Sequence, residues 1–304
     1  MGAFVTNTFS YDAAGNRTVA SSNGWQRSYG YVNNRLVSVS ANGAAASVVL
    51  YDAAGNVTSL VSRAGVTLSL SWNTLGQLVS VSTNGAFAES YAYDALGRRI
   101  STTSLSTTNH QPSTINHVYD GDHCAADTDA SGNPLRLYTW GPGVDNLLAV
   151  TVCSPASTNT FYAVKDHLGS VQALVDSSGD IAASYTYDAW GNVLSATINN
   201  SLLTINSLRY LWQGREYSAA TGLYQFRARW YAPELGRWLS PDPIGLEGGL
   251  NLYEFCRNAP VNFRDPYGED IADYNWDWLY NTSDFAAGFG DNISGGPGPT
   301  HLNF

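Results

Sequence analysis

The sequence predicts an all-β protein, and three observations support this class. Charged residues make up 13% of the 304 residues, about half of their share in an ordinary soluble domain. Glycine, serine, threonine, asparagine and aromatic residues take their place, which is typical of short strands joined by tight turns. A short motif also recurs about every twenty residues, and no convincing long amphipathic helix precedes residue 268.

The motif begins with an aromatic residue. The hexamer at 11–16, YDAAGN, recurs unchanged at 51–56, and related hexamers begin at Tyr31, Trp72 and Tyr93. The aromatic anchors therefore stand at 11, 31, 51, 72 and 93, with spacings of 20, 20, 21 and 21. A fixed period of this length is typical of stacked repeats, because one unit cannot bury its apolar face alone.

Each repeat predicts a β-hairpin. The aromatic residue ends one strand, Asp or Asn starts the turn, and glycine usually supplies a positive φ. The returning run, such as LVSVS at 78–82, alternates apolar and hydroxyl side chains, which places the apolar ones on one face. We therefore expect structural roles for the motif, with stacked rings and Asp-capped turns.

The motif continues in a looser form beyond residue 98. Turn residues recur at 118–122, 129–133, 141–145, 165–171 and 176–180, and another repeat stands at 185–192. The Ser-, Thr- and Asn-rich stretches at 101–116 and 154–160 are interpreted as loops or strand connections.

These repeats resemble the YD repeats of the Rhs family, which includes the C component of bacterial ABC (Tc) toxins and the extracellular part of teneurins. The resemblance covers roughly residues 9–268 and includes the DHLGS segment at 166–170. Members of the family wind a long β-sheet ribbon in a spiral around a hollow interior. The resemblance implies a spiralling antiparallel ribbon of hairpins, a partial shell closed by the Rhs core plug.

The charge distribution suggests a boundary near residue 269. All 15 Lys and Arg lie before it, whereas 269–304 has six acids and neither Lys nor Arg. We predict a repeat shell over 1–192, an Rhs-associated core over 193–268 and a short acidic tail over 269–304. A tail of this length is too short for the core of an enzyme, so no toxin catalysis is expected from it. Residues 273–289 are apolar enough to dock or to form a short helix.

Composition also limits the partners. The net charge of −10 argues against a general nucleic-acid binder. Three scattered cysteines do not predict a disulfide framework, and no stretch is long and apolar enough to span a membrane. Residues 1–11 lack a signal-peptide pattern. We expect no cofactor, and a secreted or cell-surface location reached through a dedicated apparatus.

Two clusters invite a chemical interpretation: His117, His123 and Cys124 with Asp120 and Asp122, and Asp166 with His167. Zinc sites need converging ligands, usually Cys or His pairs at set spacings, so no metal site is predicted in the first cluster. The second cluster lacks a nucleophile, and its place in a repeat turn favours capping and packing.

The stretch 224–268 is rich in arginine and aromatic residues and contains two Asp-Pro-x-Gly motifs, which begin at Asp242 and Asp265. Each motif alone predicts a turn. The whole block resembles the Rhs-associated core, which cuts its own chain after the second motif and releases a C-terminal toxin inside the shell. The resemblance implies chemistry of the aspartyl-protease type, in which Asp242 is the essential carboxylate, Asp265 its partner, and Arg229 orients or charge-tunes them.

The expected cut follows Gly268, where Glu269 replaces the apolar residue usual in the family. An added acid there is expected either to raise a neighbouring pKa or to prevent the substrate from seating. Self-cleavage is therefore the only enzymatic activity that we predict, and Glu269 puts it in question.

The predicted function is a structural shell that encloses or presents a C-terminal toxin or cargo segment. The alternative is a cell-surface or carbohydrate-binding module, which would carry a row of aromatic rings on its outer face. The expected partners are the chain's own C-terminal segment or a cargo, with another shell-forming chain or a secretion-system component as further candidates. An open shell, a fragment and a shell completed by another chain all remain open.

Overall fold

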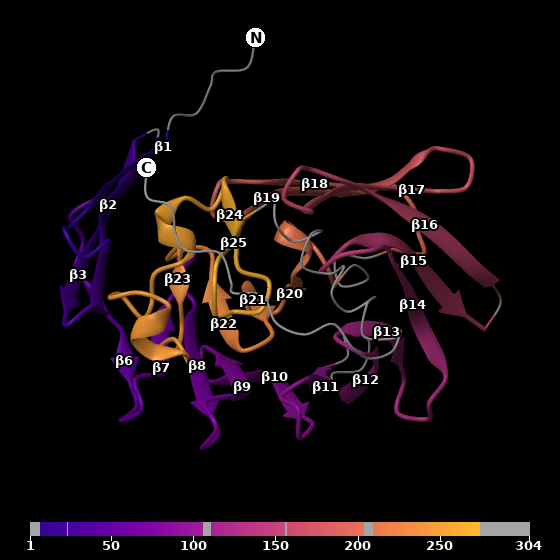
Figure 1. The fold of residues 1–304 in the computed structure, drawn as a ribbon, viewed down its shortest axis with the longest axis horizontal. Coiled ribbons are helices and arrows are strands. Elements are labelled where there is room, and N and C mark those ends of the chain that lie inside the picture. The colour runs from indigo at the N-terminus through magenta and orange to yellow at the C-terminus, as the bar shows by residue number, and fades with distance from the viewer. Residues whose placement is uncertain (1–6, 23, 106–110, 156, 204–208, 274–304) are drawn as a thin grey trace, which may run out of the picture.

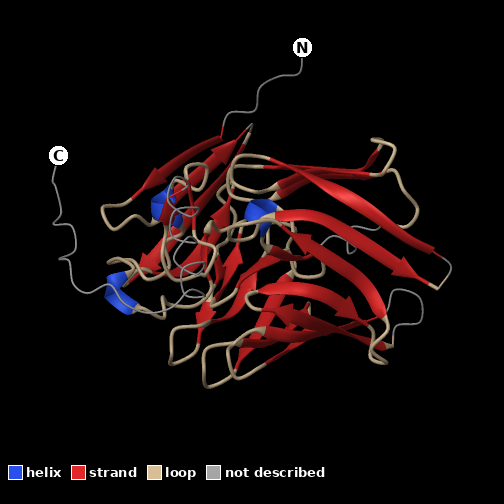
Figure 2. Cartoon of the chain, turned by 45° about the vertical axis from the view of Figure 1, so that its right-hand side comes forward, coloured by secondary structure: helices blue, strands red, loops and turns tan. Residues whose placement is uncertain are grey.

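A computed structural model of the chain describes residues 7–22, 24–105, 111–155, 157–203 and 209–273. Its strands confirm the predicted all-β class, and Figure 2 shows them over nearly the whole molecule. The helices among these residues are three single 3-10 turns, η1 (Trp212–Gly214), η2 (Gly245–Glu247) and η3 (Cys256–Asn258). No helix in the described ranges has the length and apolar character that crossing a membrane requires.

A ribbon of antiparallel strands forms the shell, and each strand pairs with its neighbours in the sequence except at the break between the fifth and sixth strands, which divides the ribbon into two sheets. The first sheet has five strands: β1 (Asn7–Tyr11), β2 (Arg17–Ser22), β3 (Trp25–Val32), β4 (Arg35–Ala41) and β5 (Ser47–Val48). The second sheet has 14: β6 (Leu50–Tyr51), β7 (Val57–Val61), β8 (Thr67–Trp72), β9 (Leu78–Thr83), β10 (Ala86–Tyr93), β11 (Arg99–Leu105), β12 (Pro112–Asp120), β13 (His123–Thr128), β14 (Pro134–Trp140), β15 (Leu147–Ser154), β16 (Ser157–Lys165), β17 (Val171–Val175), β18 (Ile181–Tyr187) and β19 (Val193–Ile198).

A plug fills the curve of this ribbon (Figure 1). Its strands are β20 (Glu216–Ser218), β21 (Leu223–Phe226), β22 (Arg229–Ala232) and β23 (Arg237–Trp238) in one sheet, and β24 (Phe263–Arg264) and β25 (Ala272–Asp273) in another. Aromatic side chains form its centre, where the rings of Tyr231 and Phe255 lie 4.3 Å apart and those of Phe226 and Trp238 5.3 Å apart. These four side chains are fully buried, so the plug supplies much of the hydrophobic core that the shell surrounds.

A register shift precedes the anchor position in each of nine repeats. It falls, for example, between Ser71 and Trp72 and between Ala92 and Tyr93, and the same shift occurs before residues 11, 31, 51, 119, 140, 165 and 187. A bulge inserts one extra residue, bends the strand and increases its twist. The repeated bulge therefore accounts for the steady curvature of the ribbon around the plug.

The aromatic anchors connect neighbouring repeats through hydrogen bonds. The Tyr51 hydroxyl donates to the carbonyl oxygen of Leu36 at 3.0 Å, and Tyr93 repeats this contact with Leu78 at 2.7 Å. Tyr31, Trp72, Tyr119, Trp140 and Tyr187 make the equivalent bond at 2.7–3.1 Å. The Asp or Asn after the anchor caps the turn, as the sequence predicted; Asp94 Oδ1, for example, accepts from the amides of Leu96 and Arg98.

The exposed aromatic side chains do not form a row. Among the described residues they are Tyr11 on β1, Phe87 on β10, Tyr162 on β16 and Tyr267 in the plug. These strands are not neighbours in the sheet. The arrangement favours a shell over the carbohydrate-binding alternative, which requires a platform of adjacent rings.

The loops predicted at 101–116 and 154–160 are largely wrong, because β11, β12 and β16 occupy most of these residues. The hydroxyls of Thr103 and Thr114 meet across β11 and β12 at 2.8 Å, and those of Thr151 and Thr160 across β15 and β16 at 2.9 Å. Threonine favours strands, and cross-strand threonine pairs stabilise them. Polar composition in these stretches therefore marks strands with a hydrated face rather than loops.

The ribbon curves around the plug without closing into a barrel. β1 and β19 are its end strands and do not pair with each other. The two ends nevertheless meet through side chains, since the ring of Phe9 lies 5.8 Å from that of Trp190 and the Arg17 guanidinium lies over Trp190 at 3.9 Å. β19 continues the sheet past residue 192, and the division of the chain into shell, core and tail remains a proposal. Residues 274–289, for which a docked segment or short helix was predicted, lie outside the described residues.

The plug docks on the hairpin turns at both ends of the ribbon. Asn251 and Asn258 donate to the carbonyl oxygens of Ala14 and Gly15, and Tyr253 donates to that of Gly55. At the other end, Tyr231 and Tyr224 donate to the carbonyl oxygens of Trp190 and Gly191, and the backbone amide of Gln213 donates to the hydroxyl oxygen of Ser170. Polar side chains thus anchor an aromatic plug to the backbone of the repeats.

Candidate active site

The two Asp-Pro-x-Gly motifs form turns, as each alone predicted. Asp242 Oδ1 accepts the amide of Ile244 at 3.1 Å. Asp265 Oδ1 accepts the amides of Gly268 at 2.7 Å and Glu269 at 3.0 Å. Turn formation leaves Oδ2 of both aspartates available for a further contact.

Arg229, on the plug strand β22, occupies the space between the two aspartates. Its Nη1 lies 2.8 Å from Asp242 Oδ2 and its Nη2 lies 3.0 Å from Asp265 Oδ2. The three side chains are 3–7% exposed, so this cluster is buried. The structure thus brings together the three residues that the sequence singled out, Asp242, Asp265 and Arg229. Their catalytic role remains a proposal.

The peptide bond between Gly268 and Glu269 lies inside this cluster. Arg229 Nε donates to the carbonyl oxygen of Gly268 at 2.5 Å, while the amide of Glu269 donates to Asp265. One end of the bond is therefore polarised by a guanidinium, and its nitrogen lies within hydrogen-bonding distance of a carboxyl group. The first contact is of the kind that stabilises a carbonyl oxygen during peptide cleavage, and the second places a carboxyl group, here as hydrogen-bond acceptor, beside the nitrogen of the same bond.

Gly268 is required by this geometry. Its φ is +72°, which L-residues with a side chain rarely adopt. A Cβ at this position would also lie 2.3 Å from the carbonyl oxygen of Phe226 and 3.0 Å from the amide nitrogen of Arg229. The absence of a side chain therefore allows the candidate bond to lie directly on β21 and β22.

Burial sets the electrostatics of the cluster. It raises the pKa of Asp265 to about 6, although Arg229 and the amides of Glu269 and Gly268 oppose this rise. Burial likewise raises the pKa of Asp242 above its usual value, against the charge of Arg229, and Asp270 adds to the rise. Burial lowers the pKa of Arg229, while the two carboxylates oppose the change. Near neutral pH a proton on Asp265 is therefore accessible at little cost.

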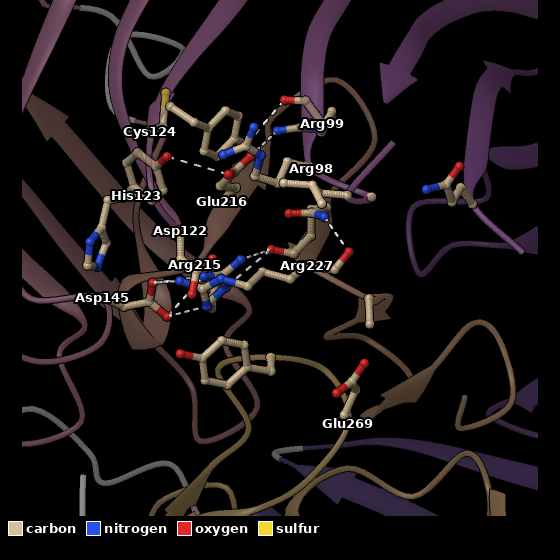
Figure 3. A pocket seen from close by; sticks show the side chains of 18 of the residues that line it. Arg98, Arg99, Asp122, His123, Cys124, Asp145, Arg215, Glu216, Arg227 and Glu269 are labelled. Carbon is tan, nitrogen blue, oxygen red and sulfur yellow. Dashed lines mark hydrogen bonds and ion pairs between the residues drawn. The ribbon is translucent and has the colours of Figure 1, made fainter. Parts of the chain in front are cut away.

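Glu269 does not occupy the cluster. Its side chain is exposed and lines a cavity of about 350 Å³ between the plug and the shell. Figure 3 shows Asp145 in this cavity with Arg215 and Arg227 on it, and Glu269 standing apart from them. Among the described residues, the Glu269 side chain therefore makes no ion pair or hydrogen bond with Asp242 or Asp265.

The structure adds residues that sequence reasoning missed. A Cβ on Gly248 would lie 2.5 Å from Asp242 Oδ2, so this glycine makes room for the carboxylate. The buried thiol of Cys256 lies near enough for Asp265 to contribute to its raised pKa, after burial itself. Cys256 begins a run of three residues with positive φ, 46–56°. No local motif signals these contacts, because they come from segments that meet only in the folded plug.

Of the first cluster weighed for metal binding, only His117 and Cys124 come together, joined by Asp127. Within the described ranges, these three place one potential ligand atom each within 4.8 Å of one another. Arg209 Nη1 contacts both Asp127 Oδ1 and His117 Nδ1. The guanidinium group of Arg209 therefore already occupies the place that a bound metal ion would take. Burial and the charge of Arg209 lower the pKa of His117 to about 4 despite Asp127. The group is a buried ion-pair network, and we propose no metal there.

The remaining candidates have structural contacts. The ring of His123 stacks on Trp140 at 4.8 Å. Asp166 Oδ1 accepts the amides of Leu168 and Ser170, which confirms its predicted capping role, and His167 Nε2 meets the carbonyl oxygen of Val261 at 3.1 Å.

Comparison with known proteins extends these observations. The family model described as Teneurin YD-shell matches residues 1–261. The tRNA nuclease WapA of Bacillus subtilis (strain 168) is 34% identical over 178 residues, which are 57% of this chain and 7% of that protein. Toxin subunit YenC1 of Yersinia entomophaga is 36% identical over 107 residues, 35% of this chain and 11% of that protein.

Among solved structures, the crystal structure of TcdB2-TccC3-TEV matches with a TM-score of 0.67 and 26% identity over 87% of this chain and 13% of that chain. The chain thus spans only a small part of the length of each of these three proteins. The fold of this chain is shared with the TcdB2-TccC3-TEV structure, and part of its sequence is shared with the tRNA nuclease WapA.

Proposed function

The chain belongs to the teneurin YD-shell family of Rhs-type repeat proteins, and from this premise we propose that it is a shell that encloses or presents a C-terminal segment and cuts its own chain between Gly268 and Glu269. The shell would deliver the released segment, or a cargo joined to it, outside the producing cell through a dedicated apparatus. The names of relatives such as toxin subunit YenC1 support a toxin context.

The proposed cut is a hydrolysis. Asp242, as carboxylate, takes a proton from water while the water oxygen attacks the Gly268 carbonyl carbon. Arg229 Nε, already on the carbonyl oxygen, stabilises the oxyanion that forms. Asp265 gives its proton to the Glu269 nitrogen as the C–N bond breaks, leaving a carboxyl group on Gly268 and an amine on Glu269. In this scheme Asp242 is ionised and Asp265 is protonated, which is the combination that acid–base catalysis by two carboxyl groups uses.

One observation carries this proposal: Arg229 and Asp265 contact the two ends of the same peptide bond. Turn formation alone explains the contacts of Asp265, but it does not require a buried arginine on the Gly268 carbonyl oxygen. That carbonyl also belongs to the last residue of the second motif, directly before the bond at which the family resemblance places the cut.

The test compares intact masses of the wild type, Asp242→Asn and Asp129→Asn under denaturing conditions. Asp129 caps an exposed repeat turn and serves as the matched control. We expect the wild type and the control to separate into fragments 1–268 and 269–304, and Asp242→Asn to remain whole. A wild type that stays at full length, or a cut at another bond, would refute the proposed self-cleavage but would not bear on the proposed shell.

A further inference from the structure

Two neighbouring shell turns, 73–76 and 94–97, are not covered by the plug. Turns at either end of the ribbon donate to or accept from plug residues, as described for Ala14, Gly55 and Gly191. No hydrogen bond joins turn 73–76 or 94–97 to the plug within the described part of the chain. Among the described residues, the plug therefore makes no hydrogen bond to the shell at these two turns, and we call this place the gap.

The repeat itself supplies an internal comparison at this gap. The residue before the turn glycine is Leu168 or Trp190 in two turns that the plug covers, and each is 3% exposed. At the uncovered turns the same position holds Leu75, 80% exposed, and Leu96, 78% exposed. Large apolar side chains at this position are buried in these two covered turns, whereas the small Ala14 and Ala54 stay exposed in two other covered turns. The two exposed leucines therefore mark an unfilled apolar contact.

A cavity opens directly beneath these leucines. Leu75 and Leu96 line it together with Arg98, Arg227 and Glu269. The side chain of Arg98 is 32% exposed and that of Arg227 is 20% exposed, although both have carboxylate partners. The opening thus combines an apolar lip with two partly hydrated guanidinium groups.

The chain has a segment suited to this opening. Residues 274–289, YNWDWLYNTSDFAAGF, alternate aromatic and apolar residues with two aspartates and contain no Lys or Arg. The described residues end at Asp273, four residues after Glu269, which itself lines the cavity. Four residues span at most about 14 Å, so the segment begins within easy reach of the opening.

We propose that residues 274–289 dock in this gap, with apolar side chains on Leu75 and Leu96 and aspartates toward Arg98 and Arg227. The proposal rests on the proposed function in taking residues from 269 onward as the segment that the shell retains, but it does not require the cut to occur. Docking would hold the segment beside the cluster of Asp242 and Asp265 and keep it bound after cleavage.

Hydrogen exchange read by mass spectrometry tests the docking. The parent protein is full-length Asp242→Asn, which keeps the segment attached whether or not the wild type cuts itself. We expect amides of 274–289 to exchange at least tenfold more slowly than in the free peptide of the same sequence. The double variant Leu75→Asp/Leu96→Asp is expected to remove this protection while leaving β8–β11 protected, because both leucines are exposed turn residues.

The matched control is Leu246→Asp/Leu250→Asp, two other exposed leucines on the plug, which should leave the protection unchanged. Exchange of 274–289 at the free-peptide rate in the parent protein, or protection that survives the Leu75/Leu96 change, would overturn the proposal. Light scattering covers the remaining occupant: if the Leu75/Leu96 change dissociates a dimer without altering the segment, a second copy fills the gap and the proposal is wrong. Failure of the proposed cut shows instead in the intact mass of the wild type.

Discussion

At the scale of single residues, the candidate site depends on how Arg229 is placed. Its guanidinium contacts Asp242, Asp265 and the Gly268 carbonyl oxygen from one buried position on β22. The planar fork of arginine presents several donors in fixed directions, which a lysine ammonium does not. A single side chain thus fixes both carboxyl groups relative to the bond between Gly268 and Glu269.

We predict that the rate constant of self-cleavage depends on pH through Asp265. Burial raises the pKa of Asp265 to about 6, so the folded chain binds this proton more tightly than the unfolded chain. The stabilising contribution of the protonated carboxyl is present at low pH and is lost as pH rises through 6. If protonated Asp265 is the acid, the cleavage rate constant should fall about tenfold per pH unit above about 6.

The measurement uses protein from a short pulse of cell-free synthesis, diluted into buffers from pH 5 to 8 and followed by intact mass. Intrinsic fluorescence, recorded in parallel, should show the fold unchanged between pH 6 and 8. A rate that is flat or that rises across this range would rule out Asp265 as the proton donor.

Sequence reasoning identified Asp242, Asp265 and Arg229 because two motifs and a family resemblance converge on them. It could not identify Gly248 or Cys256, since their contacts with the cluster depend on how the plug segments meet. It also placed the charge of Glu269 beside the carboxyls, whereas the exposed side chain lines the cavity between plug and shell. It is Asp270 that adds to the raised pKa of Asp242.

At the scale of elements, the aromatic anchor and the bulge before it define each repeat. The anchor period and the capped turns were predictable, because both depend on residues close together in sequence. The bulge was not, since it is a property of how two strands pair. The strands around Thr103 and Thr160 were missed for the related reason that hydroxyl-rich sequence looks the same in a loop and on a hydrated sheet face.

The element-scale prediction concerns the bond that each anchor makes. Tyr51→Phe removes the donor to the Leu36 carbonyl oxygen and little else, so it should lower the free energy of unfolding by about 1 kcal/mol. Tyr162→Phe is the matched control, because that ring is half exposed on β16. Urea denaturation followed by fluorescence measures both. Equal effects of the two substitutions would show that the anchor bond adds no stability.

At the scale of the whole molecule, buried ion pairs tie the plug to the shell. Asp145, in a shell turn, pairs with Arg215 at 2.9 Å and Arg227 at 2.8 Å from the plug. Burial would raise the pKa of Asp145, but the two arginines lower it below its usual value. Arg99 and Arg209 meet Glu216 in a second buried group that also crosses from shell to plug.

The whole-molecule prediction is that Asp145→Asn destabilises the docked plug. The change leaves the buried Arg215 and the partly exposed Arg227 without a counter-charge, and breaking a buried pair from one side costs about 3–5 kcal/mol. Denaturant titration should show the loss, and hydrogen exchange should place it in β20–β22 before β16–β18. Asp129→Asn, which keeps an Asx cap in an exposed turn, should behave as the wild type does. A similar response to both changes would contradict the proposed role of the pair.

The plug is hydrogen-bonded to the turn at 12–16 and to the turn at 188–192, and Phe9 packs against Trp190 where the two ends of the ribbon meet. The ribbon between these two turns therefore has to match the perimeter of the plug. We therefore expect the plug to fit a ribbon with this number of repeats better than a longer or shorter one. Inserting or deleting a twenty-residue unit would not simply lengthen or shorten the wall. It would bring a different turn to the place where the plug contacts the end of the ribbon, so we expect such a variant to lose the contacts of that end.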